Sequence, residues 1–108
     1  MTMNFTAAIK VPSDQLQFLQ SVVDAPNADL CRDDVVYENS VRFSDNSWAL
    51  FQVISTNDPA EDACWTQVVL FDERGNEMAC SDVGESILGS TDFLLIDGKN
   101  YTVNVIAE

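Results

Sequence analysis

The sequence lacks histidine altogether and has only five basic residues against eighteen acidic ones, which gives a net charge of −13. The missing histidine removes the commonest general base of enzyme active sites. Nucleic acids and anionic membranes are bound through clusters of lysine and arginine, and so few cations cannot supply such a patch. We therefore expect that neither nucleic acid nor a membrane is a direct ligand of this chain.

Long hydrophobic runs are also missing. No apolar stretch approaches the ~20 residues that a membrane span needs, and the N-terminus MTMNFTAAIK has no basic segment followed by an apolar one, as a secretory signal would. These absences predict a cytoplasmic protein. The composition is otherwise that of a folded chain, because 46% of the residues are hydrophobic and 21% are charged. We expect a single domain over residues 1–108.

Motifs for metal binding and catalysis are absent as well. Cys31, Cys64 and Cys80 form an odd set without CxxC spacing, so we expect reduced, mostly buried thiols rather than a disulfide framework or a zinc ribbon. Neither NDPAED nor DERGNE has the spacing of a calcium-binding loop. A carboxylate pair of the glycosidase type is compatible with the residue types, but so short a chain has little room for a substrate cleft. We therefore expect no metal, no cofactor and no enzymatic activity.

The hydrophobic pattern changes its period along the chain. Residues 4–11 alternate between apolar and polar side chains, as in a half-buried strand. Residues 12–24 place Leu16, Leu19 and Val22 on one helical stripe behind an N-cap at Ser13 or Asp14. The rest of the chain has a period of two, and turn signals divide it into segments that we predict as strands: 35–43, 47–55, 64–71, 76–82, 92–97 and 100–108.

Short turns between consecutive strands favour antiparallel pairing of neighbours. The sequence therefore predicts an α+β domain in which one N-terminal amphipathic helix packs on a twisted antiparallel β-meander of about six to seven strands. Residues 47–55 and 64–71 are apolar on both faces and should be central, and Trp48 and Trp65 near their starts are expected in the core. The alternative is a small β-barrel or sandwich in which the helix covers one opening.

A meander sends its turns alternately to two ends of the sheet, and this divides the acidic residues into two groups. One end receives the turns at 44–47, 73–76 and 97–99, whose acids are partly balanced by Arg74 and Lys99. The other end receives the start of the second strand and the loops at 56–63 and 83–91, balanced only by Arg32. The acids of this second group are the predicted partner-binding residues: Asp29, Asp33, Asp34, Asp58, Glu61, Asp62, Asp82, Glu85 and Asp92.

The charge density of the surface approaches that of DNA only if these acids gather. A chain of this size exposes about 6,000 Å², so its net charge, spread evenly, amounts to one charge per roughly 460 Å². Duplex DNA carries about one charge per 110 Å² of its surface. Acids gathered on a quarter to a third of the surface come close to that density. Mimicry of DNA therefore depends on the clustering that the meander predicts.

The C-terminal half contains VVLFDERGNEMACSD followed by LLIDGKNYTVNV. It resembles small acidic accessory proteins of bacterial mobile elements and phages, in which a V-L-F-D-x-x-G-x-E hairpin precedes a final D-G-x-x-Y-x-V strand pair. In size and charge the chain is also similar to anti-CRISPR and anti-restriction inhibitors, several of which occupy the DNA-binding groove of their target. This second likeness is one of composition, and it transfers no residues.

The favoured hypothesis is a non-enzymatic acidic inhibitor in the cytoplasm of a bacterial host. It would act as a DNA mimic that binds the basic nucleic-acid-binding groove of a defence nuclease, such as a CRISPR or restriction nuclease. The alternative is a protein–protein binding module or homo-oligomer that uses its sheet face or an exposed edge strand. In that case the acids serve only solubility.

Overall fold

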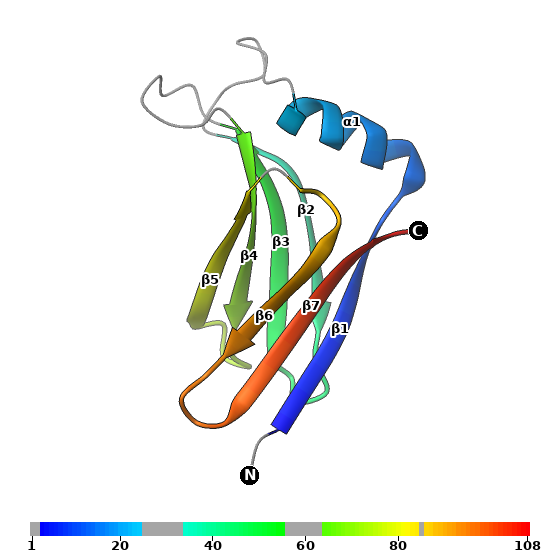
Figure 1. Cartoon of the computed structure of the whole chain (residues 1–108). Helices are drawn as coiled ribbons and strands as arrows, with labels where there is room; N and C mark the ends of the chain where they lie inside the picture. Colours follow the sequence, from blue (N-terminus) through cyan, green and yellow to red (C-terminus); the bar gives the residue numbers. More distant parts are fainter. Residues whose placement is uncertain (1–2, 25–33, 56–63, 85) are drawn as a thin grey trace.

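The computed structural model describes residues 3–24, 34–55, 64–84 and 86–108, which form seven strands and one helix (Figure 1). The helix begins after Pro12, whose carbonyl accepts hydrogen bonds from the N–H groups of Gln15 and Leu16. No helix among the described residues has the length and apolar character that crossing a membrane requires. The elements are β1 (Met3–Val11), α1 (Ser13–Asp24), β2 (Asp34–Arg42), β3 (Trp48–Ser55), β4 (Cys64–Phe71), β5 (Glu77–Gly84), β6 (Gly89–Leu94) and β7 (Lys99–Ala107).

The strands form two sheets rather than one. β2, β3, β4 and β5 pair antiparallel in chain order, which is the predicted meander over part of the chain, with β3 and β4 central as expected. The chain then leaves this sheet, because β6 pairs with β7, and β7 pairs in parallel with β1. The α+β prediction is confirmed for the elements, in a structure that is mostly β, but the meander holds only for β2 to β5.

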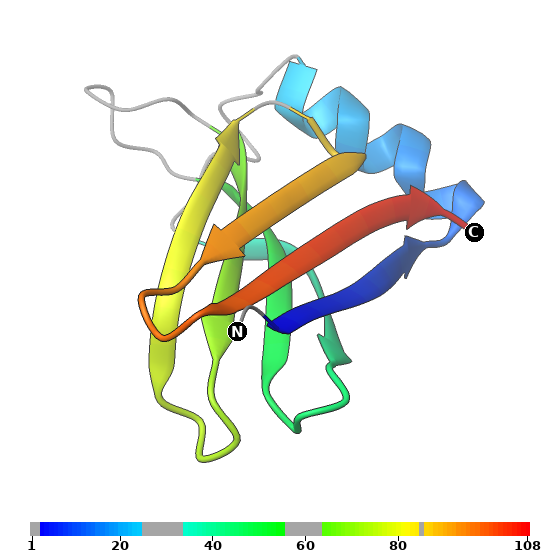
Figure 2. The same cartoon turned by 60° about the horizontal axis from the view of Figure 1, so that its bottom comes forward.

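The hydrophobic core lies between the two sheets, and α1 lies across one end of them (Figure 1, Figure 2). This arrangement agrees with the two-sheet alternative, in which the helix covers an opening rather than packing on the face of one sheet. Alternate residues of each strand point inward, as the period of two predicts. The buried core residues include Ile9 and Val11 of β1, Leu19 and Val23 of α1, Phe51 and Val53 of β3, Val68 and Leu70 of β4, and Tyr101, Val103 and Val105 of β7.

The sheets approach each other along one side and separate along the other. On the closed side, the Asn39 side-chain amide of β2 donates a hydrogen bond to the Lys10 carbonyl of β1 (3.3 Å). On the open side, β5 and β6 are the edge strands of different sheets and do not pair with each other. There the Thr66 hydroxyl of β4 donates to the Ser86 carbonyl (2.9 Å), which ties the segment before β6 to the central sheet.

The three hairpin turns gather at the end of the sheets that lies opposite α1 (Figure 1). Asn46 and Gly75 take positive φ angles of 72° and 88° in the first two turns, where their short or absent side chains tolerate this conformation. The carboxylate of Asp72 accepts hydrogen bonds from the N–H groups of Arg74 and Asn76 (both 2.9 Å) and so holds the second turn. The β6–β7 hairpin begins earlier than predicted, because β6 ends at Leu94.

Candidate functional site

Three of the nine predicted partner-binding acids lie among the residues that the structure describes. Asp34 begins β2, where its backbone pairs with Ser55 of β3. Asp82 is exposed on β5 and Asp92 is exposed on β6. The remaining predicted residues lie outside the described ranges: Asp29, Asp33, Asp58, Glu61, Asp62 and Glu85.

The described members of this set do not share one surface. Asp34 and Asp82 lie on the two edge strands of the four-stranded sheet, three strand spacings or about 14 Å apart across the sheet. Asp92 lies on the other sheet, where its carboxylate accepts a hydrogen bond from the Thr102 hydroxyl (2.7 Å). Asp82 and Asp92 therefore face away from each other on the outer faces of opposite sheets.

The acids of the hairpin turns come together as predicted. Asp45, Asp72, Glu73 and Asp97 line a small polar depression of about 120 Å³ at this end, with Lys99 as its cation. Within the described ranges, no group of three acidic, cysteine or histidine side chains has an arrangement that could hold a metal ion.

Hydrogen bonds occupy the innermost acid of this depression. The Tyr101 hydroxyl donates to the Asp45 carboxylate (2.6 Å), and so do the N–H group and the hydroxyl of Ser47. Burial acts to raise the pKa of Asp45, but the hydrogen bonds from Ser47 and Tyr101 outweigh it and hold that pKa below its usual value. Burial and the bond to Asp45 raise the pKa of Tyr101 to about 12. We interpret this cluster as a structural tie between the sheets.

The outer face of the four-stranded sheet is the more promising surface. Because side chains alternate along a strand, the buried Ala49, Phe51 and Val53 place Trp48, Leu50 and Ile54 on the opposite side of β3. The strand register extends this face from β3 to β4 and β5, because Leu50 pairs with Val69 and Val69 pairs with Cys80. We call the following residues the apolar outer face: Val35, Trp48, Leu50, Ile54, Trp65, Val69, Phe71 and Cys80. Val35 and Cys80 are exposed, Val69 is buried, and the others are half-buried.

An aromatic pair lies at one end of this face. The rings of Trp48 and Phe71 stack with their centroids 4.1 Å apart and their planes inclined by 14°. Both side chains are half-buried, as is Trp65, and none of the three belongs to the core between the sheets. The expectation that Trp48 and Trp65 lie in the core is therefore wrong. β3 and β4 are apolar on both faces, and only one of these faces is turned toward the other sheet.

A polar row crosses the middle of the apolar outer face. Gln52 donates a hydrogen bond from its side-chain amide to Glu38 (3.2 Å), and Gln67 donates to Gln52 (2.9 Å). The Trp65 indole N–H donates to the side-chain amide oxygen of Gln67 (3.4 Å). Asp82 lies next to Gln67 in the register and extends the row to β5. These bonds orient the side chains of Gln52, Gln67 and Trp65 on the face.

Charges border the face on the two edge strands. Glu38 and Arg42 lie on β2, and Glu77 and Asp82 lie on β5, all of them exposed. Cys80 is free and exposed between these last two acids, so the expectation of a buried thiol is wrong for this cysteine. Partial desolvation, together with Glu77 and Asp82, raises the pKa of its thiol, which therefore stays protonated at neutral pH.

No described element covers the apolar outer face, since α1 lies across the end of the sheets rather than on this side (Figure 1, Figure 2). The sequence indicated such a face, because the segments 47–55 and 64–71 are apolar on both sides. The chain matches no protein-family model, and neither the curated proteins nor the solved structures contain a match for it.

Proposed function

We propose that the protein is a non-enzymatic protein-binding module whose apolar outer face contacts its partner. The observation that supports this proposal is a set of aromatic and aliphatic side chains, including Trp48, Leu50 and Phe71, that no described element covers. Tryptophan and other large aromatic residues are enriched at the centres of protein interfaces. The hydrogen-bonded row through Gln52 and Gln67 keeps the surface ordered before binding, which lowers the entropy cost of association.

The charges around the face select the kind of partner. Three acids and one arginine leave a net charge of −2 there, on a chain whose total is −13. A second copy of the chain would bring acids against acids, which disfavours a homodimer through this face. The partner that fits is a protein surface with an apolar centre and flanking lysine or arginine residues.

The size of the face is compatible with this role. Four strands of eight residues cover about 500 Å², which is roughly two-thirds of the area that each partner contributes to an interface of standard size. One net charge per about 250 Å² on this face is less than half the density of duplex DNA. The apolar outer face would thus bind by shape and apolar contact, with charge guiding the approach.

The inhibitor of a bacterial defence nuclease is the second proposal, and the net charge of −13 favours it. In this case the chain would act in the cytoplasm of a bacterial host and occupy the basic groove of a CRISPR or restriction nuclease. Exposed Asp82 and Asp92 would take part from opposite sides, together with acids at 29–34 and 58–62. Both proposals name a basic protein partner, and they differ in the surface that carries the binding.

Both tryptophans of the chain lie on the apolar outer face, so their fluorescence reports on it directly. We would titrate the protein with a synthetic amphipathic peptide that has a leucine face flanked by lysines. We expect a saturable change in tryptophan emission, and amide NMR shifts on β3 and β4. A lysine-only peptide of equal charge should bind much more weakly. Equal binding of both peptides would contradict a contact made through apolar side chains.

Matched variants locate the contact. Leu50→Ser removes an aliphatic side chain from the centre of the face, whereas Leu94→Ser removes one that is 76% exposed on the other sheet. We expect Leu50→Ser to weaken binding of the amphipathic peptide by about tenfold, since truncating a central contact costs above about 1 kcal/mol. Leu94→Ser should leave the affinity unchanged. Equal effects of the two variants would argue against this face.

The inhibitor proposal has a separate test. The chain would be added to a guide-loaded Cas9-type nuclease, and target-DNA binding by the nuclease would be measured. We expect inhibition that fades steeply with added salt and is lost when Asp58, Glu61 and Asp62 are changed to Ala or Lys. Undiminished inhibition by this triple variant would sink the proposal. Inhibition that persists at high salt but is lost in Leu50→Ser would instead assign the nuclease to the apolar outer face.

A further inference from the structure

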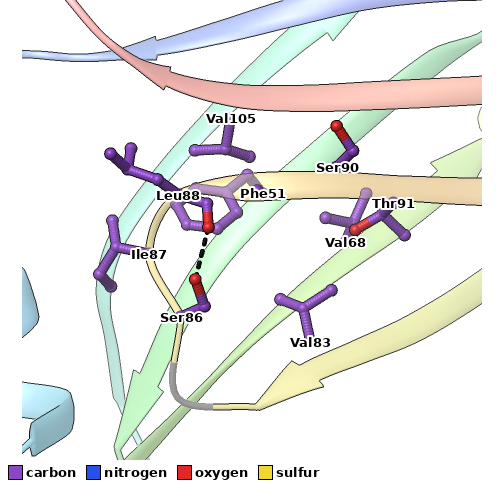
Figure 3. A pocket seen from close by; sticks show the side chains of 10 residues that line it. Phe51, Val68, Val83, Ser86, Ile87, Leu88, Ser90, Thr91 and Val105 are labelled. Carbon is purple, nitrogen blue, oxygen red and sulfur yellow. Dashed lines mark hydrogen bonds between the residues drawn. The ribbon is translucent and has the colours of Figure 1, made fainter.

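A second site lies on the open side of the molecule, between the two sheets. Where β5 and β6 separate, they leave a cavity of about 250 Å³ (Figure 3). Its walls come from several elements: Phe51 of β3, Val68 of β4, Val83 of β5 and Val105 of β7, together with residues 86–91. This cavity is separate from the apolar outer face, because its floor belongs to the opposite, inward side of the same strands.

The floor of the cavity is apolar. Phe51 and Val68 are fully buried, Ile87 is 1% exposed and Val105 is 5% exposed. Apolar cavities lined by such side chains hold no ordered water and bind small apolar molecules, and one of 150 Å³ binds benzene. By that measure, the cavity has room for a molecule of about ten non-hydrogen atoms.

One hydroxyl in the wall has no partner. Thr91 is only 8% exposed, and it lines the cavity together with Val68 (Figure 3). The two serines nearby are both used: the Ser86 hydroxyl donates to the Leu88 carbonyl, and the Ser90 hydroxyl donates to Asn104. Among the described residues, the Thr91 hydroxyl makes no hydrogen bond, and no fully buried side-chain polar atom lacks a partner, so this oxygen is accessible at the wall of the cavity. A ligand in the cavity would supply a partner for it.

The lining also determines the charge of the ligand. Among the described residues, no acidic or basic side chain lines the cavity. A charged ligand would lose its hydration without gaining a counter-ion, which is strongly unfavourable. The lining therefore disfavours carboxylates such as fatty acids, and it disfavours amines as well.

We propose that this cavity binds a small, uncharged, mostly apolar molecule whose single polar group forms a hydrogen bond with the Thr91 hydroxyl. A monocyclic phenol has this chemistry and fits the volume. The apolar ring would replace the empty space against Phe51 and Val68, and the polar group would point toward β6. The site does not depend on the protein partner proposed above.

The test uses the isotope-labelled full chain and three probes of similar size: phenol, toluene and benzoate. We expect phenol and toluene to give saturable amide shifts around Val68, Thr91 and Val105, and benzoate to give none. Thr91→Val keeps the shape of the side chain but removes its hydroxyl. It should weaken phenol binding roughly 3- to 10-fold, the effect of one lost hydrogen bond, and leave toluene binding unchanged. Equal effects on phenol and toluene would overturn the assigned hydrogen bond.

A pair of phenylalanine substitutions tests the position of the site. Val83→Phe adds a ring to the wall of the cavity and should reduce the affinity for phenol at least tenfold, whereas Val35→Phe adds the same ring at an exposed position on β2. Val35→Phe should bind phenol like the unaltered chain. The proposal is overturned if phenol and toluene give no saturable shifts, if benzoate binds as tightly as phenol, or if the two phenylalanine variants behave alike.

Discussion

The hydroxyl of Tyr101 donates a hydrogen bond to the carboxylate of Asp45 over 2.6 Å, and this bond joins the two sheets. Tyr101 belongs to β7 of the three-stranded sheet, and Asp45 lies in the turn between β2 and β3. The Tyr101 ring stacks on Phe5 (5.1 Å between centroids) and meets Phe43 edge-on (5.0 Å). One side chain thus connects the parallel β1–β7 pair to the end of the other sheet.

Tyr101→Phe should destabilise the protein by about 1–2 kcal/mol, since it removes a hydrogen bond to a charged acceptor but keeps the ring contacts. Urea unfolding measures this loss. Tyr37→Phe is the matched control, because the Tyr37 ring packs edge-on against Phe51 while its hydroxyl has no hydrogen-bond partner among the described residues. The control should change the free energy of unfolding by less than about 0.5 kcal/mol. Equal losses in the two variants would contradict the role of the Asp45 bond.

The same bond predicts how the free energy of unfolding falls at alkaline pH. The pKa of Tyr101 is raised to about 12 in the folded protein, from an ordinary value of 10.0. Because the folded value lies above the unfolded one, this contribution is complete below pH 10 and is lost as the pH rises toward 12. The loss amounts to roughly 2–3 kcal/mol. Denaturation at a series of pH values should give Tyr101→Phe a flatter alkaline limb; parallel limbs would contradict the raised pKa.

The acid limb depends on Asp45. The pKa of this carboxyl is lowered in the folded state, so its contribution is present above the ordinary value of 3.8 and is lost as the pH falls through the folded pKa. Asp45→Asn should therefore be less stable than the unaltered chain at neutral pH, and this difference should shrink in acid. Ser47→Ala removes one donor to the carboxylate and should move the Asp45 titration, followed by NMR, to higher pH. An unmoved titration would exclude Ser47 as a cause.

Local patterns in the sequence predicted the elements well. The strand expected over 47–55 is β3 (Trp48–Ser55), and the strand over 64–71 has the bounds of β4. The helix expected over 12–24 is α1 (Ser13–Asp24). Alternation and helical periodicity are properties of consecutive residues, which is why they locate elements without knowledge of the fold.

Pairing between distant strands could not be read in the same way. β1 pairs with β7 in a parallel register that joins Phe5 to Tyr101, and no turn connects these strands to indicate the partnership. β5 and β6 are consecutive in the sequence but belong to different sheets, so the rule that neighbours pair does not hold for them. The sequence indicated two strands that are apolar on both faces, but not which of these faces would remain outside, because an alternating pattern does not say which face a second sheet will cover.

The effect of a single charge on the free energy of unfolding should depend on its position in the fold. Glu73 lines the depression together with Asp72 and Asp97, so Glu73→Lys relieves repulsion and should stabilise the fold by about 0.5 kcal/mol. Asp14 lies in the first turn of α1, where a negative charge is favourable, so Asp14→Lys should destabilise by about 0.5–1 kcal/mol. Both variants change the net charge by the same amount, and both effects should fade between about 0.01 M and 1 M salt as screening shortens the range of charge interactions. Urea unfolding of the pair measures them side by side. Changes of the same sign would mean that net charge, rather than position, governs the response.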